Sequence, residues 1–500
     1  TSKGNLYTSY KEGFSKNLEG SFLSDDQGLE ITYRELDSET AKLANGLKEL
    51  GLSEGDRVTV QVSKCIEMVY LYLACVRSNI IFHPLNSAYK EKELSYFLED
   101  AKPSMFISNR ETISNIAELN LEHNINNLFT LNDDGSGDFS SIATNDSDFV
   151  TVDCEQEDIA ALLYSSGTTG QPKGIMLSHG NIASNAKTLV KTWGFEQSDC
   201  LLHALPIYHV HGLFVALGCV LMSGSRLKWH DSFKAEEVLN SIPDCTVMMG
   251  VPTYYTRLLK HDALDSKLTE KMRLFISGSA PLLDETFNEF NQRTNHLILE
   301  RYGMTETNMN TSNPLKGVRK AGTVGLPLDD VEVVVVDEEN NLLPQGEIGN
   351  LQVKGPNVFK GYWGLPEKTK EDFSEDGFFN TGDKGVIDED GYISIIGRSK
   401  DMIISGGLNV YPKEIESLID KIEGVQESAV IGLNDEDLGE KVVAIIVSSE
   451  ELTLDEKEVI AEIKNQLAGF KVPKEVKFIK QLPRNAMGKV QKNILRDTFS

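Results

Sequence analysis

Cysteine is absent after residue 245. The six cysteines, at positions 65, 75, 154, 200, 219 and 245, show no paired spacing of the kind that metal sites use. We therefore expect neither a disulfide framework nor a cysteine-bound metal. We interpret these residues as reduced core thiols of a cytoplasmic protein.

Long hydrophobic runs are absent as well. No stretch is apolar over the roughly 20 residues that a membrane-spanning helix needs. The opening stretch, TSKGNLYTSYKEGF, also lacks the apolar core of a secretory signal. These absences predict a soluble globular protein without a membrane partner.

Basic residues are few. Lysine and arginine total 49 against 76 acidic residues, which gives a net charge of −27. A field of this sign repels a polyanion, so nucleic acid is not an expected partner. A small anionic ligand remains compatible with this charge if a few basic side chains gather at one site.

Helix and strand patterns alternate up to about residue 320. Thr32 precedes a helical stripe that Gly51 closes, and the strand pattern VTVQV follows at residues 58–62. A second helix pattern runs from Cys65 to Arg77. The stripe residues are Leu36, Thr40, Leu43, Leu47 and Leu50. This alternation predicts an α/β fold of βαβ units, in which the carboxyl ends of the strands are candidate ligand sites.

The pattern changes near Thr323. Short alternating strands predict a β-rich subdomain within about 323–398. Beyond it, the order helix, strand, strand, helix, strand predicts a small α+β domain, whose second helix would begin with a capping box of Thr453 and Glu456. We therefore expect a large N-terminal domain, residues 1–398, and a small mobile C-terminal domain, residues 399–500.

A loop rich in glycine and hydroxyl groups, YSSGTTGQPKG, occupies residues 164–174. Its glycines let the backbone approach a ligand, and its hydroxyls, N–H groups and lysine can bind phosphate oxygens. It is not the nucleotide loop G-x-x-x-x-G-K-[ST], because Gln171 and Pro172 separate the second glycine from Lys173. Taken alone, it also fits a mobile surface connection. A helix is expected to begin after it, at Ser178.

Five stretches together carry a family resemblance. The loop is followed in order by RYGMTET (301–307), FNTGD (379–383), GRSKDMIISGGLNVYPKEIE (397–416) and PRNAMGKVQKN (483–493). Over essentially its whole length the chain resembles an acyl-CoA synthetase of the adenylate-forming superfamily. Within that family, RYGMTETNMNTSN, GPNVFKGYW and PRNAMGKVQKN are most similar to the malonyl-CoA synthetases.

This resemblance implies a ligase reaction in two steps. A carboxylate attacks the α-phosphate of ATP to give an acyl adenylate and pyrophosphate, and coenzyme A then displaces AMP. ATP, Mg²⁺ and coenzyme A would be the cofactors and co-substrates. Malonate would be the acid, with methylmalonate as a second candidate. Because two anions must react, such a site needs donors and cations around the transferring phosphate.

The resemblance also assigns the ATP site. The loop would hold the β- and γ-phosphates through Ser165, Ser166, Gly167, Thr168, Thr169, Gly170 and Lys173. The other expected roles are adenine and pocket lining for Tyr302, Ser279 and Ala280, α-phosphate donation for Thr305, Mg²⁺ binding for Glu306, and ribose binding for Asp383 and Arg398. By themselves, Glu306 also fits an ordinary helix-start carboxylate and T-G-D an ordinary turn.

The C-terminal domain would supply the catalytic lysine. Lys489, in PRNAMGK, would meet the charge that develops between the carboxylate and the α-phosphate. Its alternative is a solvated lysine near the end of the chain. The domain would rotate about Lys400, and Ser405, Gly406 and Gly407 would then line the pantetheine tunnel of coenzyme A.

Two arginines would select the acid. By resemblance, Arg257 and Arg301 bind the distal carboxylate of malonate, because a guanidinium fork matches a carboxylate. Arg301 could instead form a structural ion pair with Glu300 or a nearby aspartate. His209 would lie near the acyl pocket together with Ser279, or be a core histidine, whereas His211 is expected to be a packing residue.

Two other functions remain open at this stage. A short-chain or aryl-acid CoA synthetase would need no arginine pair in its acyl pocket. A non-catalytic adenylate-binding module would be expected to carry a degraded Lys489 or Glu306 motif, and both motifs are intact.

Overall fold

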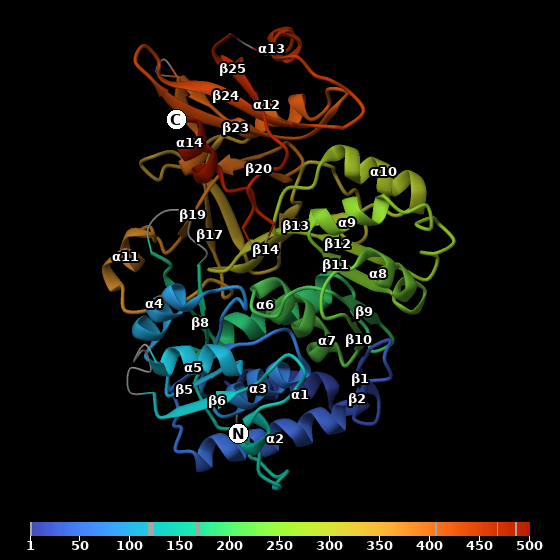
Figure 1. The fold of residues 1–500 in the computed structure, drawn as a ribbon, viewed down its shortest axis with the longest axis vertical. Coiled ribbons are helices and arrows are strands. Elements are labelled where there is room, and N and C mark those ends of the chain that lie inside the picture. Colours follow the sequence, from blue (N-terminus) through green and yellow to red (C-terminus); the bar gives the residue numbers. More distant parts are fainter. Residues whose placement is uncertain (1–2, 119–124, 166–170, 406–407, 468, 486–487) are drawn as a thin grey trace.

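A computed structural model describes residues 3–118, 125–165, 171–405, 408–467, 469–485 and 488–500. The described strands form four sheets. Figure 1 shows the chain rising from the N-terminal region at the bottom to the C-terminal region at the top. No helix of the described residues is long and apolar enough to cross a membrane.

A seven-stranded sheet lies in the N-terminal region, in the order β18-β8-β7-β4-β3-β5-β6. Its strands β7, β4, β3, β5 and β6 are parallel, as the βαβ pattern predicts, whereas β8 and β18 are antiparallel. The bounds are β3 (Arg57–Gln61), β4 (Ile81–Pro84), β5 (Met105–Ser108), β6 (Asn127–Thr130), β7 (Ile159–Tyr164), β8 (Gly174–Ser178) and β18 (Gly361–Tyr362), with helices α3 (Ile66–Arg77), α4 (Glu91–Ala101) and α5 (Arg110–Glu118).

A nine-stranded sheet has the order β15-β14-β13-β12-β11-β9-β10-β1-β2, and its six central strands are parallel. Helix α6 (His179–Thr192) contacts both β8 and β14, so it lies between the two large sheets. The strands are β1 (Ser21–Ser24), β2 (Glu30–Thr32), β9 (Cys200–His203), β10 (Arg226–Trp229), β11 (Val247–Gly250), β12 (Leu274–Ser277), β13 (Leu299–Met304), β14 (Asn308–Ser312) and β15 (Leu326–Pro327). The accompanying helices are α1 (Leu6–Phe14), α7 (Leu217–Ser223), α8 (Ala235–Ser241), α9 (Pro252–Leu259), α10 (Asp284–Thr294) and the π-helix η3 (His211–Ala216).

Local signals account for several helix ends. Thr32 caps helix α2 (Tyr33–Glu49) by accepting a hydrogen bond from the Glu35 N–H, and Ser178 begins α6 with a capping box, as predicted. Leu50 does not extend the buried stripe of α2. The helix ends one residue earlier, so Leu50 is 37% exposed.

The β-rich region is an antiparallel sheet in the order β16-β17-β19-β20. Its strands are β16 (Glu332–Val336), β17 (Gly349–Lys354), β19 (Phe379–Ile387) and β20 (Ile393–Arg398), with α11 (Pro366–Glu371) nearby. The sequence predicts three of these strands. It does not predict β19, because Gly382, Gly385 and polar residues interrupt the hydrophobic alternation.

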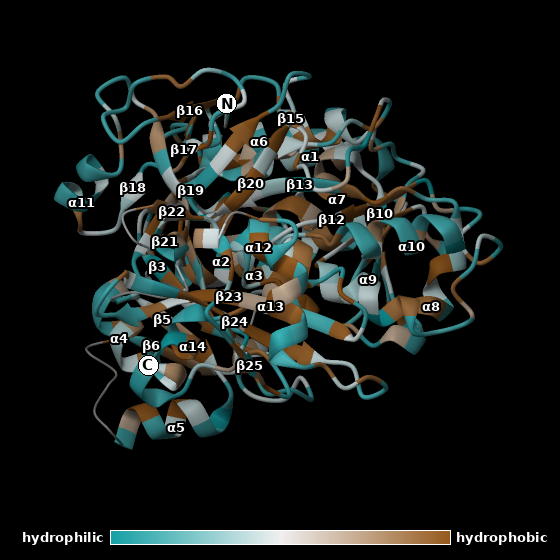
Figure 2. Ribbon diagram, turned by 90° about the horizontal axis from the view of Figure 1, so that it is seen from above, coloured by the Kyte–Doolittle hydropathy of each residue, from teal (hydrophilic) through white to brown (hydrophobic). Residues whose placement is uncertain are grey.

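The C-terminal region has its own sheet and its own core. Strands β23 (Val425–Asp435) and β24 (Gly439–Ser448) form its longest pairing, and Figure 2 shows mostly hydrophobic residues along them. The other elements are β21 (Ile403–Ser405), β22 (Leu408–Val410), β25 (Glu475–Phe478), α12 (Pro412–Ile419), α13 (Glu456–Lys464) and α14 (Lys492–Phe499). Its buried clusters begin at Ile403, whereas Ile395 still packs with the β-rich region. The boundary at 398 and the hinge remain predictions.

The predicted capping box of Thr453 and Glu456 is wrong. Asp455 is the N-cap of α13 and accepts a hydrogen bond from the Lys457 N–H, while Glu456 is the first residue of the helix. Val459 and Ile463 are fully buried. Helix α13 therefore begins where Val459 and Ile463 can face the core. Asp455, which is closer to this start than Thr453, caps the helix by accepting a backbone N–H.

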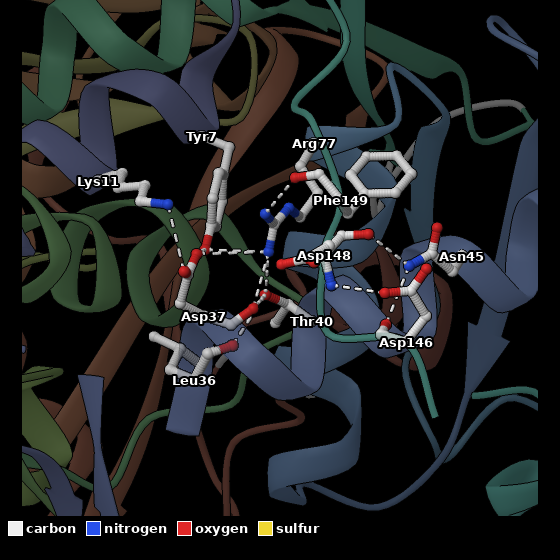
Figure 3. A network of polar contacts seen from close by, with 10 residues as sticks. All are labelled: Tyr7, Lys11, Leu36, Asp37, Thr40, Asn45, Arg77, Asp146, Asp148 and Phe149. Carbon is white, nitrogen blue, oxygen red and sulfur yellow. Dashed lines mark hydrogen bonds and ion pairs between the residues drawn. The ribbon is translucent and has the colours of Figure 1, made fainter. Parts of the chain in front are cut away.

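Arg77 ties four segments of the N-terminal region together (Figure 3). Its guanidinium is 2% exposed, pairs with Asp37 at 3.5 Å and donates to the Thr40 hydroxyl, the Tyr7 hydroxyl and the Phe149 carbonyl. These bonds from Nη1 and Nη2 stabilise the buried cation, while its Nε has no partner among the described residues.

We expect Arg77→Met to lower the free energy of unfolding by about 3 kcal/mol, because it removes the donor to the buried Thr40 hydroxyl and to the Phe149 carbonyl. Urea denaturation measures this loss. The matched change Arg34→Met removes an exposed ion pair with Glu19 and should cost less than about 1 kcal/mol. Equal losses for the two variants would contradict this account of the network.

Candidate active site

The base of the glycine-rich loop is held by the β7–β8 pair. The Ser165 N–H donates to the Lys173 carbonyl at 3.0 Å, and the Lys173 N–H donates to the Ser165 hydroxyl at 3.2 Å. The Tyr96 hydroxyl donates to the Pro172 carbonyl at 2.6 Å. Five predicted phosphate-binding residues lie outside the described residues: Ser166, Gly167, Thr168, Thr169 and Gly170.

The predicted nucleotide residues come together at the ends of β13, β19 and β20. The Tyr302 hydroxyl donates to Asp383 Oδ2 at 2.5 Å, and Arg398 Nε lies 3.8 Å from Asp383 Oδ1. Asp383 and Arg398 face each other in the β19–β20 register. Burial raises the pKa of the Tyr302 hydroxyl well above its usual range, so this group remains a donor.

Thr305 and Glu306 follow β13 directly. Both are partly buried, and the Glu306 carbonyl accepts the Phe359 N–H at 2.7 Å, which connects the GPNVFKGYW stretch to the site. Desolvation raises the pKa of the Glu306 carboxyl, while the charges of Arg398 and Lys489 lower it. One hard oxygen donor beside a phosphate site fits Mg²⁺, which shares a carboxylate with substrate phosphates.

Lys489 reaches the same site from the C-terminal region. Its backbone N–H donates to Asn485 Oδ1 at 3.0 Å, and Gly488 before it has a φ of +81°, a conformation that favours glycine. The side chain keeps contact with solvent, yet the surrounding protein removes enough water to lower the pKa of its ammonium. Arg398 lowers this pKa further, and Asp383 and Glu306 raise it. Lys489 is therefore an exposed lysine that lies close enough to Arg398, Asp383 and Glu306 for their charges to shift its pKa.

Arg301 is a buried cation with unused donors. It is 2% exposed, and its Nε and Nη2 have no hydrogen-bond partner among the described residues. Desolvation lowers its pKa to about 10, and neighbouring Glu300 opposes this shift. The Glu300 carboxylate instead accepts the Leu282 N–H at 3.2 Å. The structural ion pair considered as an alternative for Arg301 is not formed with the described residues.

Gly278 makes room for this guanidinium. A Cβ at residue 278 would lie 2.1 Å from Arg301 Cζ. The next residue, Ser279, has a φ of +72°, which is unusual for a residue other than glycine. The turn after β12 therefore brings backbone, a serine hydroxyl and the arginine to one place. Ala280 is partly buried in the same turn.

Two histidines face the same region. His211 is buried and His209 is partly buried, and each has a buried Nε2 atom without a hydrogen-bond partner among the described residues. His211 Nδ1 lies 3.3 Å from the Ser279 hydroxyl. Burial lowers the pKa of His209 to about 3, and the charge of Lys489 adds to this effect. Both rings are neutral, and His211 has a free polar edge beyond its expected packing role.

The remaining predicted residues are less directly placed. Arg257 is exposed in the last turn of α9, and the structure does not bring it into contact with Arg301. Lys400 is exposed in the short helix Ser399–Asp401, where burial of its stem lowers the pKa of its ammonium. Ser405 is buried at the end of β21, and Gly406 and Gly407 lie outside the described residues.

Sequence reasoning missed some residues of the site. Gly278 and the buried Ser277, whose hydroxyl has no partner among the described residues, belong to the Arg301 region. The signal was present in ISGSAPL, since a glycine directly after a buried strand permits close approach of another group.

Comparison with known proteins agrees with this geometry. Residues 16–363 match the model of the AMP-binding enzyme family, and residues 414–489 match that of the AMP-binding enzyme C-terminal domain. The malonate–CoA ligase of Arabidopsis thaliana is 37% identical over 491 residues, which cover 90% of this chain and 79% of the relative.

Solved structures of MatB from Rhodopseudomonas palustris are 48% identical, with 99% of each chain covered. The TM-score is 0.96 for the ATP-bound form and 0.86 for the apo form, so the chain as a whole superposes better on the ATP-bound form. The resemblance inferred from the sequence motifs is thereby confirmed, and so is the mixed α/β fold with a smaller C-terminal domain. The chain belongs to the AMP-binding enzyme family, within the adenylate-forming superfamily.

Proposed function

We propose that this chain is an ATP-dependent malonate–CoA ligase. The malonate carboxylate attacks the α-phosphate of ATP, forming malonyl adenylate and releasing pyrophosphate. The thiol of coenzyme A then attacks the adenylate carbonyl, forming the thioester and releasing AMP. The observation that carries the choice of acid is Arg301, a buried guanidinium of which two nitrogens have no partner in the described part of the chain.

The physical reason is the cost of a desolvated charge. A buried arginine without an anion is unfavourable, and a carboxylate pairs with its parallel N–H groups. A dicarboxylate satisfies Arg301 with one end and presents the other end to ATP. An acid with an apolar end leaves the guanidinium unpaired, so butyrate and benzoate should be rejected by roughly 10⁴-fold. This separates the proposal from a short-chain or aryl-acid synthetase.

The other roles follow the geometry of the nucleotide site. Tyr302 would lie against adenine beside Ser279 and Ala280, Asp383 and Arg398 would bind ribose, Thr305 would donate to the α-phosphate, and Ser165, Lys173 and the loop between them would hold the outgoing phosphates. Glu306 would hold Mg²⁺, which neutralises charge on the phosphates when bound. Lys489 would stabilise the charge that develops at the α-phosphate.

The thioester step requires a different use of the same site. We propose that the C-terminal domain rotates about Lys400, which withdraws Lys489 and lets Ser405, Gly406 and Gly407 line the path of the pantetheine arm. The support is that Lys489 comes from a region with its own hydrophobic core.

The six free cysteines support a location in the reducing cytoplasm.

Arg301→Leu tests the choice of acid. We expect kcat/KM for malonate to fall by about 10³-fold or more, with the KM for ATP little changed, because only the bond to the distal carboxylate is lost. Malonate-dependent exchange between ATP and pyrophosphate measures both constants. Arg257→Leu should have a smaller effect, since an exposed guanidinium is already hydrated. Unchanged malonate use by Arg301→Leu would refute the assignment.

Gly278→Ala tests the space that Arg301 needs. The added methyl would occupy the position of the guanidinium, so we expect a loss of malonate activity of about 10²-fold or more. Gly218→Ala is the matched control, because its Cβ would meet its nearest neighbour, the Cβ of Ala186, at an ordinary 3.4 Å. Equal activity of the two variants would mean that Arg301 does not depend on this contact.

Lys489→Ala tests the division between the two steps. Adenylate formation should fall by about 10²- to 10³-fold, whereas thioester formation from synthetic malonyl adenylate should be retained. Lysine acts here in its charged form, and its pKa is lowered, so the wild-type adenylation rate should fall as pH rises through that lowered pKa. Equal loss of both half-reactions would contradict a role confined to adenylation.

A further inference from the structure

Lys64 is a partly buried lysine that the reaction described above does not use. It lies between β3 and α3, and its ammonium is enclosed at the carboxyl ends of β9 and β10. It donates to His203 Nδ1 at 2.8 Å, to the His203 carbonyl at 3.2 Å and to the His230 carbonyl at 2.7 Å. Its Nζ also lies 4.4 Å from the centre of the Trp229 ring. These contacts account for the whole bonding capacity of an ammonium.

The next link is the His203 ring. His203 is 1% exposed, and its Nε2 lies 2.9 Å from the Gly212 carbonyl oxygen. A carbonyl can only accept, so Nε2 carries a hydrogen. Desolvation, and then the charge of Lys64, lower the pKa of His203 well below its usual range, so the ring is neutral. Nδ1 is therefore unprotonated and accepts from Lys64, which fixes one tautomer and one ring orientation.

Gly212 lies in the π-helix η3, directly after His211, and His209 lies just before this helix. Its carbonyl also accepts the Leu217 N–H, and a Cβ at residue 212 would lie 1.9 Å from the Pro206 carbonyl oxygen. His211 is the first residue of η3, and the His209 carbonyl accepts the Leu213 N–H at 3.0 Å. Single π-turns are frequent at functional sites, where they direct side chains that a regular helix would turn away.

We infer that Lys64 is a positioning residue for the acyl half of the active site. It holds His203, His203 holds the Gly212 carbonyl, and this bond fixes the turn from which His211 faces Ser279 and Arg301. Lys64 itself touches neither ATP nor the acid. The inference rests on the proposed function for the identity of that acid. The relay, from Lys64 through His203 to the Gly212 carbonyl, rests on its hydrogen bonds alone.

A pocket of about 280 Å³ lies next to Lys64 and is also lined by Tyr208, Tyr254 and Phe233. It has room for water, so a variant without the ammonium can hydrate the exposed carbonyls of His203 and His230. The titratable groups around Lys64 are the neutral His203 ring, the His230 ring and Asp231, which accepts the Trp229 indole N–H at 2.9 Å. Loss of Lys64 should therefore disturb the orientation of His203 more than the fold.

The test compares Lys64→Met with wild type. We expect the KM for malonate to rise by about 10- to 100-fold in the exchange between ATP and pyrophosphate, with the KM for ATP within about twofold. The side-chain nitrogens of His203, observed by NMR in protein labelled with ¹⁵N-histidine, should change from one tautomer to a mixture. That second readout does not depend on activity.

Two further variants isolate the relay. His203→Gln keeps an N–H near the position of Nε2 and should retain much of the malonate affinity, whereas His203→Leu should lose it. Lys64→Met combined with His203→Leu should be no worse than His203→Leu alone, because both changes break one chain of contacts. Lys228→Met is the matched control: Lys228 is 9% exposed on β10 and pairs with Asp26 at 2.7 Å. It should change thermal stability without changing the KM for malonate.

The outcomes are separable. If Lys64→Met lowers only the melting temperature and leaves the malonate KM and the His203 nitrogens unchanged, Lys64 is a structural clamp and the inference fails. If wild type shows no malonate-dependent exchange, the proposed function fails, while the His203 nitrogen shifts still decide whether the relay exists.

Discussion

The structure depends on keeping positive charge unneutralised inside a strongly negative chain. With 27 more acidic than basic side chains, an exposed cation is expected to form an ion pair with a carboxylate. Arg301 forms no such ion pair with the described residues, because Gly278 and Tyr255 enclose it and because Glu300 accepts a backbone N–H instead. Desolvation raises the pKa of Glu300 to about 7, which further weakens its competition for the guanidinium. In the proposed function, this cation is available for an anion that arrives from outside.

The same constraint explains why the site draws on distant segments. No single helix or strand can bring several cations together without placing them side by side, where they repel. Arg301 comes from β13, Arg398 from β20 and Lys489 from the C-terminal region, so each charge is held by a different part of the fold. Lys413 of α12 donates to the Ile395 carbonyl at 2.6 Å across the junction of the two regions, which supports the arrangement that brings Lys489 inward.

The sequence predicted what depends on short patterns. Parallel strands, the cap at Ser178 and the motifs around Tyr302, Asp383 and Lys489 were recognisable because neighbouring residues define them. The choice between two similar neighbouring residues could not be predicted in this way. Thr453 and Asp455 are both good N-caps, and the burial of Val459 and Ile463 decided between them. Arg257 and Arg301 looked alike in sequence, yet one is exposed and the other enclosed, since burial depends on elements far away in the chain.

The close contact between Gly278 and Arg301 also constrains how such a pocket can diverge. A larger residue at position 278 cannot be accommodated while the arginine is present, whereas loss of the arginine first leaves a void that a new side chain can later fill. An evolutionary change of substrate from diacids to apolar acids would therefore require substitution of the arginine before substitution of the glycine. The reverse path, toward diacids, would have to restore the glycine before the arginine.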